Sequence, residues 1–579
     1  MVKNDLAALI QQAIAAAQAA GDLPPFDPPE VVVDHPKEAG HGDYDCPVAL
    51  KLARVAKMPP LKIAQAIARH LPAAEFLARV EVAPPGFLNF TLSERWLARQ
   101  VATILAQGER FGQVDIGRGK RVQVEFVSVN PTGPIHIGHA RGAALGDSLA
   151  RLLAAAGYQV QREYYFNDAG SQMDKFYHSL YARYCQVLGR DEPVPDDGYH
   201  GNYMLDLARE IVAEQGDRFL SLPREQAIAA LAPIGAERMI GIIKEDLRRM
   251  GVQFDCWFLE RSVYSGGQYE KIMALLQERG FLEEKDGAIW FTSSALGQDK
   301  DNVVVRSSGE PTYFATDIAY HYNKFIERGF DWVINIWGAD HQGHVPRMKA
   351  MMQALGLDPE RLTLIIMQLV TLKRGGEVVR ISKRTGDIIT LRDVLDEVGP
   401  DAVRFLLISR AADAQMDFDL DQAKAQSEEN PVFYVQYAHA RIASIQRYAD
   451  EALSRRTSRN GGRDSGSEER RGDGEMGRQG DKEIVTLLTH PAELALIRQM
   501  LRLPELVEEA ATRLEPHHLP HYAQELAASF HSFYKQCRVV SSDPADAALS
   551  AARLRLVQAA RIVLANTLYL MGMTAPEQM

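Results

Sequence analysis

Hydrophobic positions near the start of the chain follow first a helical period and then a strand-like one. Leu6, Ile10 and Ile14 recur every fourth residue and would share one face of a helix. The later run "ARVEVAPPGFLNFTL", residues 78–92, alternates apolar and polar side chains around a Pro-Pro-Gly break. A helical segment followed by short strands predicts a small α+β domain over residues 1–115.

A new pattern begins at Arg121, where a strand, a glycine-rich turn, a long helix and a second strand follow one another. Val122, Val124 and Phe126 alternate in the strand. The helix has one apolar face and stops at Gly157. That face consists of Leu145, Leu149, Leu152, Leu153 and Ala156. This order is typical of a parallel nucleotide-binding unit, so residues 116–390 are predicted to form an α/β Rossmann-like core with a helical insertion at about 175–300.

From Thr390 onward the apolar spacing is helical almost throughout. It predicts a connecting helical region over residues 391–430 and an all-α bundle over 431–579. Residues 454–481 interrupt this pattern, because Met476 is their only apolar side chain and they cannot bury enough surface to order themselves. The predicted fold is therefore multidomain, with a disordered insertion in the bundle.

Charge and cysteine usage narrow the class of protein. The chain has 65 Lys and Arg against 76 Asp and Glu, a net charge of -11, which argues against a uniformly basic nucleic-acid coat but not against an RNA partner. The four cysteines show no CxxC spacing, so they suggest neither a zinc ribbon nor a disulfide framework. The first helix is too polar for a signal peptide, and no uninterrupted apolar run would span a bilayer. We therefore expect a cytoplasmic protein that does not bind a membrane.

Two motifs carry candidate chemistry. The stretch "NPTGPIHIGHARG", residues 130–142, places His136 and His139 where a strand passes into a helix, and such a helix start faces phosphate well. The two histidines could instead hold a metal, which would need further ligands, or fill a packed turn. The loop "RISKRTG", residues 380–386, offers Lys383 as a phosphate clamp, although charged loops of this kind are usually only solvated. A second H-x-G-H pattern, "HQGH", occupies residues 341–344.

Together these motifs resemble the HIGH and KMSKS pair of class I aminoacyl-tRNA synthetases. Longer runs are similar specifically to arginyl-tRNA synthetases of bacterial type, among them "REYYFNDAG", "YFATDIAYH", "WGADHQGH", "TLRDVLDEVGPDAVRFLL" and "NPVFYVQYAHARI". The similarity covers almost the whole chain. It implies an enzyme that activates L-arginine with ATP to arginyl-adenylate and transfers the arginyl group to the 3' end of tRNA(Arg), releasing pyrophosphate and AMP.

The resemblance also implies roles for single residues. The catalytic set would be His136 and His139 at the ATP phosphates and Lys383 neutralising the leaving pyrophosphate. The remaining ATP-binding residues would be Gly138, Gly338, Asp340, His341 and Ser382. A guanidinium substrate demands carboxylates, and the arginine-binding residues would be Glu125, Asn130, Tyr313 and Asp317. For each carboxylate an ordinary buried ion pair is the alternative.

Two positions of the KMSKS-like loop depart from the family pattern, since Arg380 replaces Lys and Ile381 replaces Met. Charge and apolar character survive, so loop function is expected to persist. We expect ATP to act with Mg2+, no protein-bound zinc, and a monomer. The N-terminal domain would touch the tRNA elbow and the bundle would bind the anticodon.

Two other functions compete with this one. The first is another nucleotidyl-transfer enzyme with the HIGH motif, including a synthetase for a different amino acid. The second is a noncatalytic tRNA-binding relative. Arginine-dependent exchange between ATP and pyrophosphate, with and without tRNA, distinguishes all three.

Overall fold

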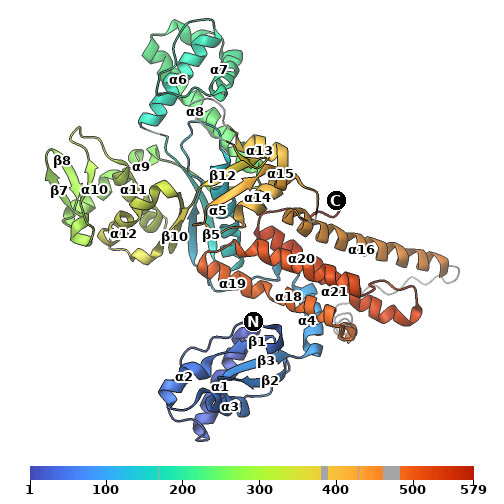
Figure 1. Ribbon diagram of the computed structural model, residues 1–579. Coiled ribbons are helices and arrows are strands. Elements are labelled where there is room, and N and C mark those ends of the chain that lie inside the picture. Colours follow the sequence, from blue (N-terminus) through green and yellow to red (C-terminus); the bar gives the residue numbers. More distant parts are fainter. Residues whose placement is uncertain (169, 380–388, 428, 461–482) are drawn as a thin grey trace, which may run out of the picture.

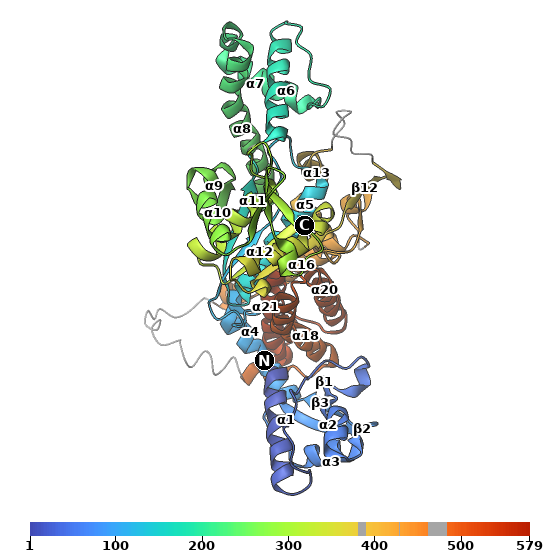
Figure 2. The same ribbon diagram turned by 90° about the vertical axis from the view of Figure 1, so that its left-hand side faces the viewer.

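The computed structural model describes residues 1–579 except 169, 380–388, 428 and 461–482. The chain is elongated (Figures 1 and 2), with the N-terminal domain at one end, a helical projection at the other, and the parallel sheet and the bundle between them.

The N-terminal domain consists of helices packed on a three-stranded antiparallel sheet of order β1-β3-β2. Leu6, Ile10 and Ile14 are fully buried on one face of the first helix. The predicted α+β domain is thus confirmed in type. Its elements are α1 (Val2–Ala19), β1 (Tyr44–Cys46), α2 (Val48–Ala56), α3 (Pro60–Arg69), β2 (Leu77–Ala83) and β3 (Phe87–Leu92). The next helix, α4 (Glu94–Gln107), packs against the C-terminal bundle instead.

The core of the central domain is a five-stranded parallel sheet of order β11-β10-β4-β5-β6. Its strands are β4 (Arg121–Glu125), β5 (Gln159–Phe166), β6 (Cys256–Leu259), β10 (Trp332–Gly338) and β11 (Leu362–Met367). The strand order reverses between β4 and β10, and ligands of such sheets bind in the crevice at the carboxyl ends of the strands there. The predicted Rossmann-like core is confirmed.

The region from about 175 to 300 differs from the single helical insertion predicted. Its first part is a helical projection of α6 (Ser171–Val187), α7 (Asn202–Gln215) and α8 (Arg224–Arg249), at the top of Figure 1. The chain then returns to the main sheet through β6 before a second unit of α9 (Arg261–Ser265), α10 (Gln268–Glu278), β7 (Leu282–Lys285), β8 (Ala288–Phe291) and β9 (Asn302–Val305). These strands have four residues each, too few for a clear period, and the Asp286-Gly287 turn between two of them is the sequence signal of this hairpin.

Among the described residues, α8 alone is long and apolar enough, by length and composition, to cross a membrane. It contains Pro233, Glu237 and Arg238. Gly235 faces α6 so closely that an added Cβ would lie 2.3 Å from a methyl group of Leu180. This helix therefore packs against protein along that face.

The second half of the central domain contains both helices and strands, and one of the strands follows Thr390, where helices alone were predicted. It comprises α11 (Tyr313–Tyr322), α12 (Val345–Ala354), β12 (Val370–Arg374), β13 (Glu377–Val378), α13 (Leu391–Val398), α14 (Pro400–Ile408), β14 (Met416–Asp419) and α15 (Leu420–Lys424). Strand β14 pairs in parallel with β12, so the predicted all-helical connection over 391–430 was wrong at this point. A four-residue strand beside two amphipathic helices gives little sequence signal.

The C-terminal bundle is helical throughout its described residues, as predicted. It comprises α16 (Pro431–Asn460), α18 (Pro491–Leu501), α19 (Leu503–Arg513), α20 (His518–Gln536) and α21 (Ala547–Leu570). Helix α16 extends to Asn460, into the segment 454–481 predicted to be disordered, because a formed helix propagates through residues of modest propensity. Residues 461–481 lie outside the described residues.

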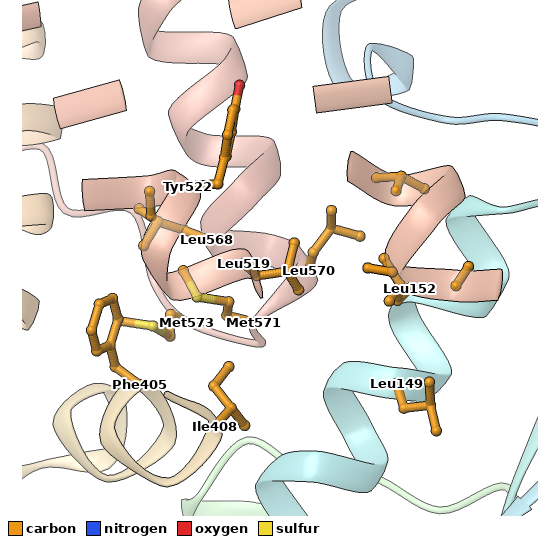
Figure 3. Close-up of a cluster of buried hydrophobic side chains, with 14 of the residues drawn as sticks. Leu149, Leu152, Phe405, Ile408, Leu519, Tyr522, Leu568, Leu570, Met571 and Met573 are labelled. Atoms are coloured by element: carbon orange, nitrogen blue, oxygen red, sulfur yellow. The ribbon is translucent and has the colours of Figure 1, made fainter. Parts of the chain in front are cut away.

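The bundle joins the central domain through a continuous apolar cluster. Figure 3 shows α5 (Ile137–Ala155) contributing Leu149 and Leu152, opposite side chains from α14 and the bundle. The other labelled members are Phe405, Ile408, Leu519, Tyr522, Leu568, Leu570, Met571 and Met573. Helix α5, which carries the first histidine motif, is thus packed between the sheet and the bundle.

Candidate active site

The first histidine motif lies at the start of α5, immediately after the carboxyl end of β4. His136 occupies the position before the helix, and its carbonyl accepts from the backbone N–H groups of His139 (2.9 Å) and Ala140 (3.1 Å). The rings of His136 and His139 stack with centroids 3.5 Å apart and planes inclined by 27°. Both rings are half-buried, so the predicted pair shares one face at the positive end of a helix.

Two glycines allow this close packing. A Cβ on Gly138 would lie 3.1 Å from Cε1 of His136, so glycine here leaves room for the histidine ring. A Cβ on Gly146 would lie 2.1 Å from Cγ of Phe126, so any side chain at this position would overlap the Phe126 ring. Helix α5 can therefore approach the sheet closely and hold its first turn at the sheet edge.

The second H-x-G-H pattern follows β10, the strand adjacent to β4. Val333, Ile334 and Asn335 pair in register with Gln123, Val124 and Glu125, so the ends of both strands lie side by side. Gly338 precedes the short helix Ala339–His344, where Nε2 of His341 lies 3.6 Å from Oδ2 of Asp340. The Asp340 carboxylate is 82% exposed and accessible to a ligand. These candidates and the His136 pair thus flank the point where the strand order reverses.

Glu125, the last residue of β4, forms an ion pair with a lysine of the same chain. Nζ of Lys324 lies 2.5 Å from Oε2 of Glu125, and both side chains are buried. The ammonium also donates to Oδ1 of Asn335 at 3.0 Å. Lys324 belongs to the π-helical turn Asn323–Glu327 that follows α11. The Glu125 carboxylate is thereby already paired.

Asp317 on α11 occupies a different electrostatic environment. Burial raises its pKa to about 7, Arg347 opposes this shift, and the carboxylates of Glu125 and Glu260 add to it. An aspartate in such surroundings binds a cation strongly, because the cation offsets both the burial and the repulsion.

Glu260 is a site residue that the sequence analysis missed. It directly follows β6, is 4% exposed, and burial raises its pKa to about 7 despite a hydrogen bond from Tyr165. Within the described part of the chain its Oε2 accepts no hydrogen bond. A carboxylate at the carboxyl end of a parallel strand was the available signal, but β6 lies in the range interpreted as a helical insertion.

Asn130 and Tyr313 lie at the outer edge of the site. Nδ2 of Asn130 donates to Oε1 of Gln172 at 2.6 Å, which attaches the motif turn to α6. The Tyr313 side chain, at the first position of α11, is half exposed, and its hydroxyl lies 3.3 Å from an ideal Cβ on Gly170. The structure therefore brings α11, the β5–α6 connection and the motif turn to one region.

Lys383 and Ser382, with Arg380 and Ile381, lie outside the described residues. The chain that follows them is described and meets the first motif. Thr390 forms an antiparallel bridge with His136, and the backbone N–H of Leu391 donates to the carbonyl of Ile135 at 2.6 Å. The described chain from Thr390 onward, which follows the KMSKS-like loop in sequence, is therefore attached beside His136.

The metal interpretation of His136 and His139 gains no support from their surroundings. Among the described residues, one group of three or more potential ligands has donor atoms close enough to share an ion, and it consists of Glu515, His517 and His518 in the bundle. The favoured chemistry for the first motif remains phosphate binding at a helix start.

Three family models cover the chain in order. They are the "Arginyl tRNA synthetase N terminal domain" at residues 4–92, "tRNA synthetases class I (R), catalytic domain" at 100–443 and the "DALR anticodon binding domain" at 435–579. The arginine–tRNA ligase of Dehalococcoides mccartyi is 53% identical over 578 residues, covering 100% of this chain and 99% of the relative. The arginine–tRNA ligase of Heliobacterium modesticaldum is 48% identical over 584 residues, with the same coverage.

The chain belongs to the arginyl-tRNA synthetase family. The solved arginyl-tRNA synthetase of Thermus thermophilus is 25% identical, with a TM-score of 0.73 and full coverage of both chains. A putative arginyl-tRNA synthetase structure from Campylobacter jejuni is 33% identical, with a TM-score of 0.72 over 84% of this chain and 100% of that one.

As an arginyl-tRNA synthetase, the enzyme activates L-arginine with ATP and joins the arginyl group to tRNA(Arg). The function inferred from the motif resemblance is confirmed. A synthetase for a different amino acid and a noncatalytic relative are both excluded.

Proposed function

We propose that Asp317 and Glu260 bind the guanidinium of the arginine substrate. The observation that carries this assignment is the pair of carboxylates, Glu260 buried and Asp317 half-buried, each with its pKa raised to about 7, chiefly by burial. A guanidinium is a planar fork of donors that carboxylates meet in bidentate fashion. One substrate cation would stabilise both charged forms at once. The half-buried Tyr165 donates a hydrogen bond to Glu260, and Tyr313 on α11 would supply a further hydroxyl to the substrate.

This pocket makes arginine binding depend on pH with a definite sign. With pKa values near 7, both carboxyls are partly protonated at neutral pH, and only their charged forms pair with a guanidinium. Arginine binding therefore releases protons, and affinity rises between about pH 6 and pH 8. Calorimetry of arginine binding in buffers of different ionisation enthalpy measures this release directly.

Glu125 and Asn130 act at the amino acid's backbone end. The ion pair with Lys324 holds the Glu125 carboxylate in one orientation at the end of β4. Its free acceptor capacity and the Asn130 side-chain amide would then meet the α-amino group of arginine. The substrate would lie across the ends of the strands with its carboxylate toward the first histidine motif.

ATP would enter as a complex with Mg2+ and lie at the point where the strand order reverses. His136 and His139 would donate to the phosphates at the start of α5, while Gly138 leaves room for their stacked rings. Gly338, Asp340 and His341 would hold the adenosine. Lys383, with Ser382, would neutralise the departing pyrophosphate, and the bridge between Thr390 and His136 supports this placement of the loop. No zinc is assigned to this catalytic centre.

The assignment of the arginine pocket is tested by Asp317→Asn and Glu260→Gln, which keep shape and remove charge. Each should weaken arginine binding by roughly 2 to 5 kcal/mol, because a buried guanidinium loses its partner, while the KM for ATP stays near normal. The readout is arginine-dependent exchange between ATP and pyrophosphate, with and without tRNA. The control is Glu283→Gln, an exposed carboxylate on β7. An unchanged KM for arginine in both pocket variants would overturn the assignment.

Lys383→Ala tests the loop. It should lower kcat for adenylate formation by about 10²- to 10³-fold with little change in the KM for arginine. Lys300→Ala, an exposed lysine in another loop, is the matched control. Near-normal turnover of Lys383→Ala would contradict a role for this loop in catalysis.

For tRNA, we propose that the N-terminal domain contacts the elbow and the bundle receives the anticodon. An aromatic face on α16 and α20 supports the second contact. Phe433 and Tyr437 stack with centroids 5.9 Å apart, and Arg441 lies over the rings of Tyr437 (5.7 Å) and Tyr534 (4.6 Å). Tyr437 is exposed and the other two rings are half-buried, and accessible rings with a guanidinium nearby are suited to unpaired bases. The enzyme would work as a cytoplasmic monomer without a membrane contact.

A further inference from the structure

A dense group of potential metal ligands lies where α19 ends and α20 begins. The run "EPHH", residues 515–518, supplies one carboxylate and two imidazoles, and one donor atom of each lies within 4.8 Å of the other two. Nε2 of His518 is 3.0 Å from Oε2 of Glu515. The rings of His517 and His518 have centroids 4.3 Å apart. Three donors of types that bind transition metals thus converge on one point.

The backbone beneath this group is well anchored. Leu514 adopts a left-handed conformation (φ 59°) that ends α19, and the N–H of Glu515 donates to the carbonyl of Ala510 at 2.9 Å. Immediately after the histidines, Leu519 is fully buried, and Figure 3 shows it with Tyr522 in the central apolar cluster. The donors therefore project from a fixed turn, and all three residues are half-buried.

The spacing suits a tetrahedral ion with little rearrangement. Bonds of about 2.0 to 2.1 Å in tetrahedral geometry place neighbouring donors about 3.3 to 3.4 Å apart. Nε2 of His518 and Oε2 of Glu515, at 3.0 Å, are slightly closer than that spacing, and the donor atoms of all three residues lie within 4.8 Å of one another. Two imidazoles with one carboxylate favour zinc or a similar transition metal over Mg2+ or Ca2+, which prefer oxygen ligands throughout.

An ion pair between Glu515 and His518 is the simpler explanation, but it uses only two of the three groups. The ion pair does not involve the His517 ring, although one donor atom of that ring lies within 4.8 Å of a donor atom of each of the other two residues. A neutral imidazole is the form that binds metals, and the Glu515 carboxylate offsets part of an ion's charge.

The group borders a cavity that can admit an ion and its water. His518 lines a cavity of about 170 Å³ between the bundle and the N-terminal domain. His521, one turn further along α20, faces the same cavity, as do Asp34 and His35 of the N-terminal domain. The group is therefore accessible from this polar cavity on the side of His518.

We propose that Glu515, His517 and His518 form a binding site for a divalent transition metal of the zinc type, with water as the fourth ligand. This departs from the expectation of no protein-bound zinc, which rested on cysteine spacing and on the surroundings of His136. The site belongs to the bundle and is separate from the catalytic centre, so it stands independently of the residue roles proposed there.

The test uses the full-length, untagged enzyme after treatment with a chelator, titrated with ZnCl2 in a calorimeter at pH 7.5. We expect one zinc ion per chain, with affinity falling as pH drops and the histidines protonate. His518→Gln and His517→Gln should each weaken binding at least about tenfold. His41→Gln, an exposed histidine of the N-terminal domain, should bind as the parent does. Binding that is absent, or equal in all four proteins, would overturn the proposal.

Cobalt provides a second readout that does not depend on the variants folding well. Co2+ bound to two imidazoles, a carboxylate and water should give the visible d–d absorption of a four-coordinate site. The four free cysteines are the competing ligands, and three of them are buried. A strong thiolate charge-transfer band in the near ultraviolet would place the ion on a cysteine and refute the proposal.

Discussion

The helical bundle makes two junctions that differ in chemistry. Its junction with the central domain is apolar and interlocked, built from the side chains of Figure 3 around a buried arginine. Its junction with the N-terminal domain is polar, with a cavity of about 170 Å³ between the two surfaces. The comparison indicates which parts of the enzyme keep a fixed geometry and which can shift at small energetic cost.

Arg404 holds the first junction. Its guanidinium donates to Oδ2 of Asp147 on α5 (2.5 Å), to the carbonyl of Met571 (2.7 Å) and to that of Met250 (3.2 Å). Gly572 leaves space for it, since a Cβ there would lie 2.0 Å from Nη2. Four elements thus meet at one fully buried side chain: the motif helix α5, α14, the end of α8 and the end of α21.

A few polar groups connect the bundle to the N-terminal domain at the second junction. Glu505 of α19 accepts from the Tyr44 hydroxyl (2.8 Å) and contacts Nε2 of His35 (2.8 Å). Arg498 pairs with Asp43 at 2.5 Å. The Arg498–Asp43 pair is partly exposed to water, and these few polar contacts contribute less than a packed core. The bundle should therefore move with the motif helix, while the N-terminal domain adjusts its position separately.

The largest expected effect is at Arg404. Arg404→Met removes the charge from a fully buried pair and takes a donor away from the carbonyls of Met250 and Met571, of which the second still accepts from the Ser148 hydroxyl at 3.4 Å. We therefore expect a loss of about 3 to 5 kcal/mol in unfolding free energy. The measurement is chemical or thermal unfolding followed by circular dichroism. Arg95→Met, an exposed arginine on α4, should change stability by less than about 0.5 kcal/mol. If the two variants were equally stable, Arg404 would not hold the first junction, and the proposed difference in rigidity between the two junctions would be contradicted.

Sequence predicted the parts of this arrangement that are local. The strand, turn and helix around His136 follow from short-range periodicity, and all were confirmed. The partners of buried charges were not predictable, because Lys324 lies 199 residues from Glu125 and Arg404 lies 257 residues from Asp147. Glu260 was missed because its strand has four residues and no clear period. Ion pairs between residues far apart in sequence can be identified only once the fold is known.

A smaller loss is expected from the apolar side of the first junction. Leu568 is fully buried in the cluster of Figure 3, and Leu568→Ala should cost about 2 to 4 kcal/mol through lost burial and a cavity that the interlocked helices cannot close. Leu487→Ala, at a 43% exposed position, is the control and should cost under about 1 kcal/mol. A Leu568→Ala cost as small as the control's would mean that this junction relaxes as easily as the polar one.

The polar junction should respond to acid. Burial alone would raise the pKa of Glu505, but His35 and the Tyr44 hydroxyl hold it below the ordinary value of 4.5. A carboxylate whose pKa is lower in the folded state than in the unfolded state stabilises the fold at pH values above its unfolded-state pKa. That stabilisation is lost as the pH falls through the folded-state pKa. Glu505→Gln should cost about 1 to 3 kcal/mol at pH 7, and the difference from the parent should shrink below about pH 4.5. A difference that stays constant from pH 7 to pH 3.5 would contradict this account.

The smallest effect is expected at Lys3, which borders the same cavity. Nζ of Lys3 lies 3.8 Å from Oε2 of Glu508, a long contact between two side chains that are about a quarter exposed. Water and salt screen such a pair, so Lys3→Ala should cost less than about 0.5 kcal/mol and less still at high ionic strength. Unfolding at low and high salt, with Lys3→Arg as the variant that keeps the charge, measures this. If Lys3→Ala instead cost as much as Glu505→Gln, charge at the rim would hold the N-terminal domain as firmly as the buried hydrogen bonds, and the second junction would be stiffer than its cavity and polar contacts indicate.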